Sequence, residues 1–290
     1  MTRKANYPLF LRPVTRDYIW GGTKLSERYG RGSGAIAESW ELWDGCRIEN
    51  GSLAGKTFAE VLGGEFPLLV KLLDAREKLS VQVHPSDGNA RAGERGKEEL
   101  WYILEAEEGA FLYCGLQREL SEEELCAAAM DGSIEQLLCK VPVSAGDCIH
   151  IAPGTIHALG AGILTAEFQQ NSDTTFRLYD YGRGRELHLE RGCAVAERRA
   201  GCCEKYRARG EGPLREIIRA KHFCLRELCS RERIRLCARD FQHLLVLEGE
   251  SRLIHGGLEY ELYPGASVFL PEGLGEYSIE GPCRALITEK

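Results

Sequence analysis

Long apolar runs are absent from the 290-residue sequence, and no stretch is long enough to span a membrane. The opening residues MTRKANYPLF lack the apolar core of a secretory signal, so we expect a cytoplasmic protein. Positive charge is not in excess either, because the net charge is −7. We therefore expect neither nucleic acid nor a membrane as a partner, and an anionic substrate would need a local cluster of Arg and Lys.

The twelve cysteines lack the spacing of a zinc-binding motif, since no C-x-x-C pair occurs. Cys202 and Cys203 are adjacent, and Cys224, Cys229 and Cys237 are spread out. In a cytoplasmic protein this pattern favours reduced thiols that pack as small hydrophobic residues.

A G-x-G-x-x-G motif and an alternation of strands with helices are also absent, which argues against a dinucleotide-binding fold. Instead, short strand-like segments are separated by Gly, Pro and Asp. Examples are FPLLVKLLDA, KLSVQVHP, GDCIHIAPG and ASVFLPEG. This spacing predicts an all-β sandwich or barrel.

One segment, residues 118–140, interrupts the β pattern and is expected to be helical. Ser121 with Glu124, and Ser133 with Gln136, each have the spacing of a helix-capping box, so we expect two short helices.

A stretch rich in Arg, Gly and Glu, residues 197–213, marks a candidate domain boundary. We therefore expect a domain of residues 1–200 that contains the helical insertion, and a second domain of residues 201–290. The segments that begin at Gly146 and Gly265 both run from Gly through an apolar strand to Pro and Gly. This echo suggests two copies of one β module, of which the second has lost its histidine.

The segment VQVHP places Gln82 and His84 on the same side of a strand, because strand side chains alternate. A glutamate, Glu98 or Glu99, follows in KEELWYIL, and His157 comes after a Pro-Gly turn. Alternation alone does not decide between the two glutamates. Catalytic zinc sites commonly use three protein side chains and leave one position open. Two histidines, a glutamate and the Gln82 carbonyl therefore form a candidate metal site.

The spacing resembles that of cupins, in which a pair of ligands two residues apart precedes a glutamate and a later histidine. Gly146-Asp147, Pro153, Gly154 and His157 fit the second cupin motif. Gln82 departs from the first motif, in which a histidine is usual. The other histidines have no such context and are expected to be structural or exposed: His150, His188, His222, His243 and His255.

Longer segments resemble the type I mannose-6-phosphate isomerases in their shorter bacterial form. The resemblance is carried by KLLDAREKLSVQVHP, GKEELWYIL and PGTIHALGAGILTAEFQQNSDTTFRLYDYGRGRELHL, and it spans nearly the whole chain. It implies two cupin-type jelly-roll modules, the second without metal, and one zinc ion per chain. It also implies the interconversion of mannose 6-phosphate and fructose 6-phosphate through a cis-enediol, on a protein that we expect to be monomeric.

The resemblance assigns roles position by position. The implied zinc ligands are Gln82, His84, Glu99 and His157, and the implied catalytic residues are Arg177, Glu167 and Lys97. Glu167 is a candidate for proton transfer or ring opening, and Arg177 for stabilising the enediolate or holding phosphate. Lys97 could neutralise phosphate or act on a ring oxygen. Structural roles stay open, such as an ion pair of Arg177 with Asp180.

Two other functions fit the same residues. Two histidines and one carboxylate also bind iron in non-haem oxygenases, some of which are cupins. A relative could alternatively bind a sugar phosphate without turning it over.

Overall fold

A computed structural model describes residues 5–290 of the chain, which form two compact units. Unit 1 contains residues 5–16, 23–71 and 207–290, and unit 2 contains residues 17–22 and 72–206. Residues 5–16 and 23–71 therefore belong with the C-terminal segment, whereas we expected them in a domain of residues 1–200. The reason is strand pairing, because strand β1 (Leu9–Arg12) is hydrogen-bonded to β22 (Ser267–Leu270).

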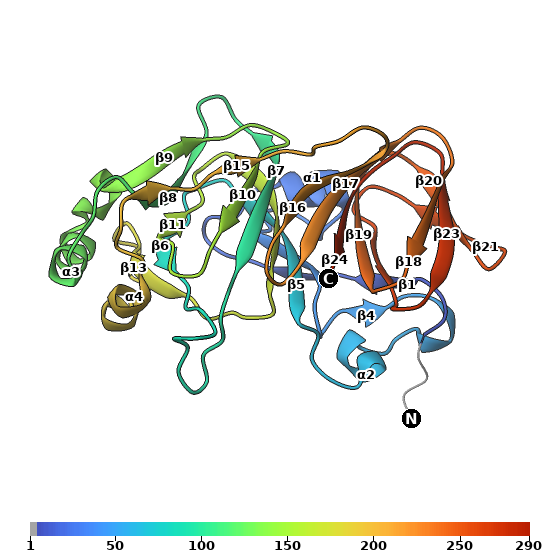
Figure 1. Ribbon diagram of the computed structural model, residues 1–290, viewed down its shortest axis with the longest axis horizontal. Coiled ribbons are helices and arrows are strands. Elements are labelled where there is room, and N and C mark those ends of the chain that lie inside the picture. Colours follow the sequence, from blue (N-terminus) through green and yellow to red (C-terminus); the bar gives the residue numbers. More distant parts are fainter. Residues whose placement is uncertain (1–4) are drawn as a thin grey trace. The chain divides into compact units, whose positions relative to one another are not determined.

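Unit 1 contains two antiparallel sheets (Figure 1). The larger has the order β16 (Leu214–Arg219), β17 (Cys224–Ser230), β24 (Cys283–Glu289), β19 (Gln242–Glu248), β22, β1 and β4 (Arg47–Ile48). The smaller has the order β18 (Ile234–Ala238), β23 (Gly275–Glu280), β20 (Ser251–His255) and β21 (Leu258–Leu262). Buried residues of both sheets, such as Leu244 and Leu253, pack into one core, as expected of a jelly-roll module.

Five further elements belong to the described part of unit 1. They are β2 (Val14–Arg16), α1 (Lys24–Tyr29), β3 (Glu38–Leu42), the 3₁₀ turn η1 (Gly51–Leu53) and α2 (Phe58–Leu62). The chain then passes from unit 1 into unit 2 within β5 (Leu68–Ala75).

Unit 2 contains the strands on which the predicted site lies. One sheet has the order β13 (Phe176–Tyr179), β6 (Val81–Val83), β11 (His157–Ala158), β8 (Phe111–Leu116) and β14 (Gly201–Cys202), and β9 (Leu138–Pro142) also pairs with β8. A second run of strands has the order β15 (Lys205–Tyr206), β10 (Cys148–Ile151), β7 (Glu99–Ala106), β12 (Ile163–Gln170) and β5. The predicted, mainly β fold is thus confirmed.

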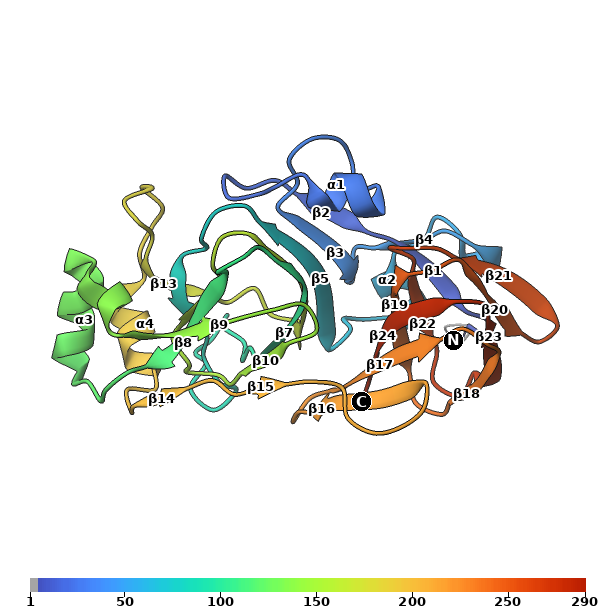
Figure 2. The same cartoon turned by 90° about the horizontal axis from the view of Figure 1, so that it is seen from above.

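The predicted helical insertion is present in unit 2. Helix α3 (Glu122–Asp131) begins with the predicted capping box, in which Ser121 accepts from the Glu124 amide and Glu124 accepts from the Ser121 amide. The second predicted box is wrong. Only a 3₁₀ turn, η2 (Ser133–Gln136), follows, and its N-cap is Gly132, which has no side chain to accept a hydrogen bond. Helix α4 (Leu189–Val195) lies beside α3, as Figure 2 shows.

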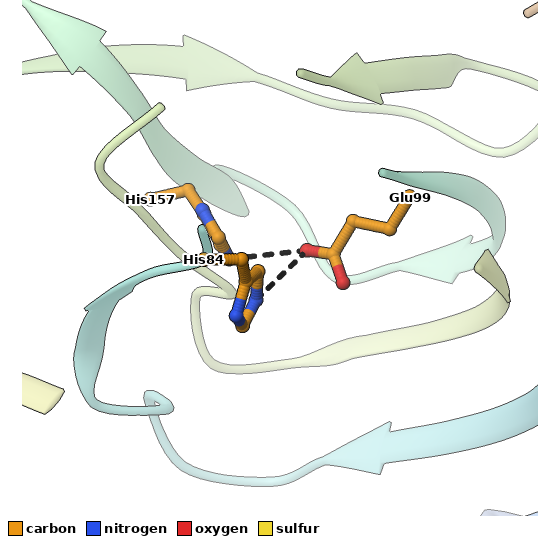
Figure 3. A group of neighbouring side chains, drawn as sticks. All are labelled: His84, Glu99 and His157. Atoms are coloured by element: carbon orange, nitrogen blue, oxygen red, sulfur yellow. Dashed lines mark ion pairs between the residues drawn. The ribbon is translucent and has the colours of Figure 1, made fainter. Parts of the chain in front are cut away.

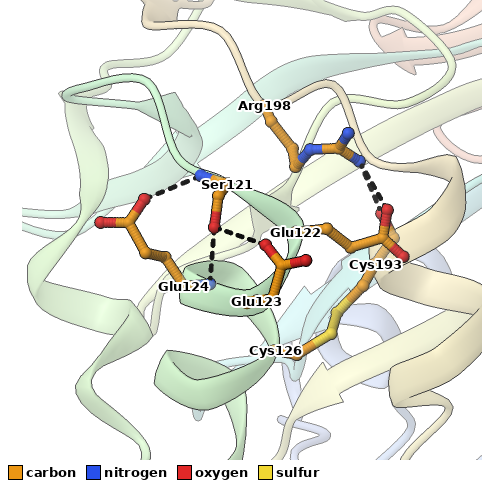
Figure 4. The surroundings of a disulfide bond; sticks show 7 residues. All are labelled: Ser121, Glu122, Glu123, Glu124, Cys126, Cys193 and Arg198. Carbon is orange, nitrogen blue, oxygen red and sulfur yellow. Dashed lines mark hydrogen bonds and ion pairs between the residues drawn. A yellow bond between two sulfur atoms is a disulfide. The ribbon is translucent and has the colours of Figure 1, made fainter.

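Three disulfide bonds cross-link unit 2, and the prediction of reduced thiols is therefore wrong for six cysteines. The pairs are Cys114–Cys203, Cys126–Cys193 and Cys139–Cys202. Figure 4 shows the bond between α3 and α4. Adjacent residues of an extended segment point to opposite sides, so Cys202 and Cys203 reach cysteines on two different strands. The partners are 63 to 89 residues apart in sequence, and only the fold brings them together.

The other six cysteines are free thiols, as we predicted. Cys46, Cys148, Cys224 and Cys283 are buried free thiols. Among the described residues, no helix is long and apolar enough to cross a membrane.

Candidate functional site

Three side chains of types that bind metal ions lie close together in unit 2, as Figure 3 shows. They are His84, Glu99 and His157. The Oε1 atom of Glu99 lies 3.0 Å from Nε2 of His157 and 3.6 Å from Nε2 of His84. The potential ligand atoms of all three residues lie within 4.8 Å of one another. Each residue is at most 1% exposed. A buried carboxylate beside two imidazole rings is an arrangement that a cation would stabilise.

Strand register explains how these residues meet. Gln82 in β6 lies directly opposite His157 in β11 and, on its other side, opposite Arg177 in β13. Residues that face each other across paired strands share one face of the sheet, so these three form a cross-strand row. His84 follows β6 two residues after Gln82, and Glu99 is the first residue of β7.

Backbone carbonyls orient both imidazole rings and select their tautomer. The Nδ1 atom of His84 lies 2.9 Å from the Thr174 carbonyl, and Nδ1 of His157 lies 2.9 Å from the Thr155 carbonyl. A carbonyl only accepts, so each Nδ1 carries the proton and each Nε2 offers a lone pair to the centre. Burial, together with the nearby Lys97 ammonium, lowers the pKa of His84 to about 4. This ring is therefore neutral at pH 7.

Lys97 determines the charge of the carboxylate. Its Nζ atom lies 2.6 Å from Oε2 of Glu99 and 3.3 Å from Nε2 of His84. Burial opposes ionisation of Glu99, but Lys97 and the two histidines outweigh it and hold the pKa of this carboxyl well below its usual range. The centre thus offers one carboxylate and the imidazole rings of His84 and His157.

The structure resolves the choice between the neighbouring glutamates. Glu98 points to the other side of the strand, where its Oε1 atom lies 2.9 Å from Nε2 of His150. Its backbone amide donates to the Gln170 side chain. Glu99 alone of the two therefore joins the histidines, and His150 has the structural contact that we expected.

Gln82 adds a fourth group next to the histidine pair. Its amide nitrogen is placed 3.2 Å from Nε2 of His157, and rotating the amide by 180° would exchange the nitrogen for the oxygen. With His84, Glu99 and His157 this donor set fits Zn²⁺, which accepts imidazole and carboxylate ligands in a centre with one open position.

Glu167 lies beside this centre. Its Oε1 atom is 3.9 Å from Nζ of Lys97 and accepts a hydrogen bond of 2.9 Å from the indole nitrogen of Trp101. Residues Trp101 and Glu167 are direct partners across β7 and β12. Sequence reasoning assigned no role to Trp101, although its position two residues after Glu99 already placed both side chains on one face of the strand.

Arg177 is partly buried at the end of the row. Its Nη1 atom donates to the Glu186 carbonyl, 2.8 Å away. Burial, followed by repulsion from Arg185, lowers the pKa of its guanidinium, which nevertheless stays charged at pH 7. Asp180, the suggested structural partner, forms its ion pairs with Arg183 and Arg185 at 2.9 and 2.6 Å.

The β modules and the buried His/Glu/His centre define a cupin-type protein with a metal-binding capacity. Comparison with known protein families identifies more specific relatives within this class. The family model for the mannose-6-phosphate isomerase cupin domain matches residues 231–289, and that for the catalytic domain of type I phosphomannose isomerase matches residues 38–112.

Several relatives match along nearly the whole chain. The probable mannose-6-phosphate isomerase GmuF of Bacillus subtilis is 35% identical, with 97% of this chain and 99% of the relative covered. Mannose-6-phosphate isomerase ManA of the same organism is 36% identical, with 97% and 98% covered. The crystal structure of the mannose 6-phosphate isomerase from Bacillus subtilis has a TM-score of 0.89 at 31% identity, with 98% of this chain and 99% of that chain covered. This chain belongs to the type I phosphomannose isomerase family.

Proposed function

We propose that this protein is a zinc-dependent isomerase that interconverts mannose 6-phosphate and fructose 6-phosphate. The observation that carries the proposal is the convergence of His84, His157 and Glu99 beside Lys97 and Glu167 in one buried group. Relatives named for this activity at 35% and 36% identity support it.

The proposed reaction moves a proton between C1 and C2 of the sugar through a cis-enediol. Such a step needs a base that carries the proton and positive charge that stabilises the developing oxyanion. In this proposal His84, Glu99, His157 and Gln82 hold one zinc ion per chain, which when bound polarises sugar oxygens.

Three further residues, Glu167, Lys97 and Arg177, have proposed roles beside the metal centre. Glu167 is a carboxylate held by Trp101 and close to Lys97, which suits proton transfer at C1 and C2 or at the ring oxygen. Lys97 keeps Glu99 ionised and adds positive charge near the sugar. Arg177 retains its charge at neutral pH and suits the enediolate or the phosphate.

The decisive experiment is conversion of mannose 6-phosphate to fructose 6-phosphate by one preparation in three states: as purified, after chelation and after zinc is restored. We expect activity that disappears with chelator and returns with zinc. The absence of activity in a preparation shown to contain zinc would overturn the proposal.

One alternative has an observation in its favour, because two histidines and a carboxylate also suit non-haem iron. Oxygen consumption by the iron-loaded protein, without isomerisation by the zinc-loaded protein, would favour that function. Sugar phosphate binding without turnover would instead indicate a non-catalytic binder.

We also predict that the protein is a monomer and that it is located in the cytoplasm. Disulfide bonds are uncommon in cytosolic proteins, whereas this structure has three. The number of free thiols in protein isolated under alkylating conditions therefore tests the predicted location.

A further inference from the structure

We propose that Trp101 is a positioning residue that orients both Glu167 and the ring of His157. The inference rests on the proposed isomerase function. It assigns a role to a residue that neither holds the metal nor carries the proton.

Trp101 is rigidly placed. It lies within β7, where its backbone is opposite Glu167 of β12 on one side and Ile149 of β10 on the other. Its side chain is fully buried. A side chain of this size, enclosed by close-packed neighbours, has little room to change its rotamer.

Its indole N–H holds a single oxygen of the Glu167 carboxylate. The distance from Nε1 to Oε1 is 2.9 Å, and the ammonium of Lys97 approaches the same oxygen at 3.9 Å. The hydrogen bond and the ion pair involve the same carboxylate oxygen and therefore restrain rotation of the group. Because the indole is a neutral donor, it restrains the carboxylate without placing a second positive charge beside it.

The same indole packs against His157. The two ring centroids lie 5.3 Å apart with an angle of 78° between the ring planes, an edge-to-face contact. The Thr155 carbonyl already holds Nδ1 of this histidine. The plane of the ring, and with it the direction of the Nε2 lone pair, is thus fixed by two contacts.

One rigid side chain therefore sets the relative positions of a metal-binding histidine and a proton-transferring carboxylate. Catalysis depends on such positions to within fractions of an ångström, and small displacements cost large factors in rate.

The test compares the zinc-loaded wild type with Trp101→Phe, Glu167→Gln and the double variant. Trp101→Phe keeps an aromatic ring but removes the N–H. We expect it to retain one zinc per chain and a KM within about twofold, while kcat falls about tenfold or more. Because Trp101 acts through Glu167, the double variant should be no slower than Glu167→Gln alone.

A control separates this role from simple loss of packing. Tyr277→Phe in unit 1 removes a hydrogen bond of 2.8 Å from a buried aromatic ring to Gln242 and should leave kcat unchanged. If Trp101→Phe does not fold, Trp101→Leu, whose side chain also has no hydrogen-bond donor, takes its place.

Two results would overturn the inference in an active wild-type enzyme. One is unchanged kcat in the Trp101 variant, and the other is a loss in the double variant equal to the product of the single losses. An inactive zinc-loaded wild type would instead count against the proposed isomerase function itself.

Discussion

Arg177, Gln82 and His157 lie side by side on three neighbouring strands, but they differ in what they can do. The guanidinium of Arg177 is a cation and cannot bind zinc, so Arg177→Ala should keep the metal while kcat falls about 10²- to 10³-fold. His84→Ala removes a proposed zinc ligand and should lose both metal and turnover. Metal content per chain and initial rates on mannose 6-phosphate measure the two effects.

Arg199, whose side chain is 79% exposed and pairs with Glu197, provides a matched control. Arg199→Ala should match the wild type in metal content and rate. Full activity of Arg177→Ala would remove Arg177 from the proposed mechanism.

Residues were predictable from the sequence where strand alternation decides the direction of a side chain. Gln82 and His84 are two residues apart, and the structure turns both toward His157 and Glu99. The choice of Glu99 over Glu98 depended on the resemblance, because the start of β7 is not visible from alternation alone. Trp101 was missed because its importance lies in its partner across the sheet, which depends on the pairing of β7 with β12.

At the scale of elements, two disulfide bonds join β8 and β9 to the segment that follows α4, and we expect them to stabilise the fold. The Cys114–Cys203 bond closes a loop of 89 residues. A cross-link over a long loop restricts the unfolded chain, so Cys203→Ala should lower the free energy of unfolding by about 2–4 kcal/mol. A dithiol reductant, which is oxidised as each bond opens to two thiols, should destabilise the wild type more than the variant.

The measurement is urea unfolding with and without the reductant, combined with a thiol count. The unreduced, unfolded wild type should show six free thiols of its twelve cysteines. Cys229→Ala, at an exposed free cysteine, should leave the stability within about 0.5 kcal/mol. Twelve free thiols in protein prepared without reductant would show that the bonds do not form.

The two serines of the helical insertion give a second prediction at this scale. Ser121 accepts a hydrogen bond from the Glu124 amide at the start of α3 (Figure 4), so Ser121→Ala should cost about 1 kcal/mol of unfolding free energy. Ser133 caps nothing with its side chain, since Gly132 is the N-cap of η2. Ser133→Ala is therefore the matched control, and equal losses for both variants would contradict the capping assignment.

At the scale of the whole molecule, the sequence indicated the mainly β class but not how the chain is divided. The strand pairs β1–β22 and β1–β4 bring residues from both ends of the chain into one sheet of unit 1. Pairing between segments more than 200 residues apart leaves no local pattern, whereas the composition of residues 197–213 marked the junction near Arg207. The assignment of residues 1–200 and 201–290 as functional domains stays a prediction.

The stability of the whole molecule should also depend on pH through a residue far from the site in sequence. His243 in β19 is fully buried, and burial lowers its pKa to about 3. Ser267 donates to the Glu41 carbonyl and accepts from Nε2 of His243, at 2.7 and 2.8 Å. A second proton would go to Nδ1, which has no hydrogen-bond partner among residues 5–290.

The sign of the effect follows from proton binding. Between pH 6.5, where an unfolded histidine titrates, and pH 3, the unfolded state binds a proton that the native state does not. The free energy of unfolding therefore falls as the pH falls through this range, and the contribution of His243 reaches about 2 kcal/mol at pH 5. Above pH 6.5 this residue is neutral in both states and costs nothing.

His243→Gln keeps a donor for Ser267 but does not titrate. Urea unfolding at pH 7 and pH 5 should show that the wild type loses about 2 kcal/mol more stability on acidification than this variant does. His255→Gln, the same substitution at a partly exposed position of β20, is the control for the exchange of side chain itself. An equal loss in the wild type and in His243→Gln would contradict this prediction. It would show that the native state accommodates a protonated His243, and that the hydrogen bonds from His243 through Ser267 to the Glu41 carbonyl break below neutral pH.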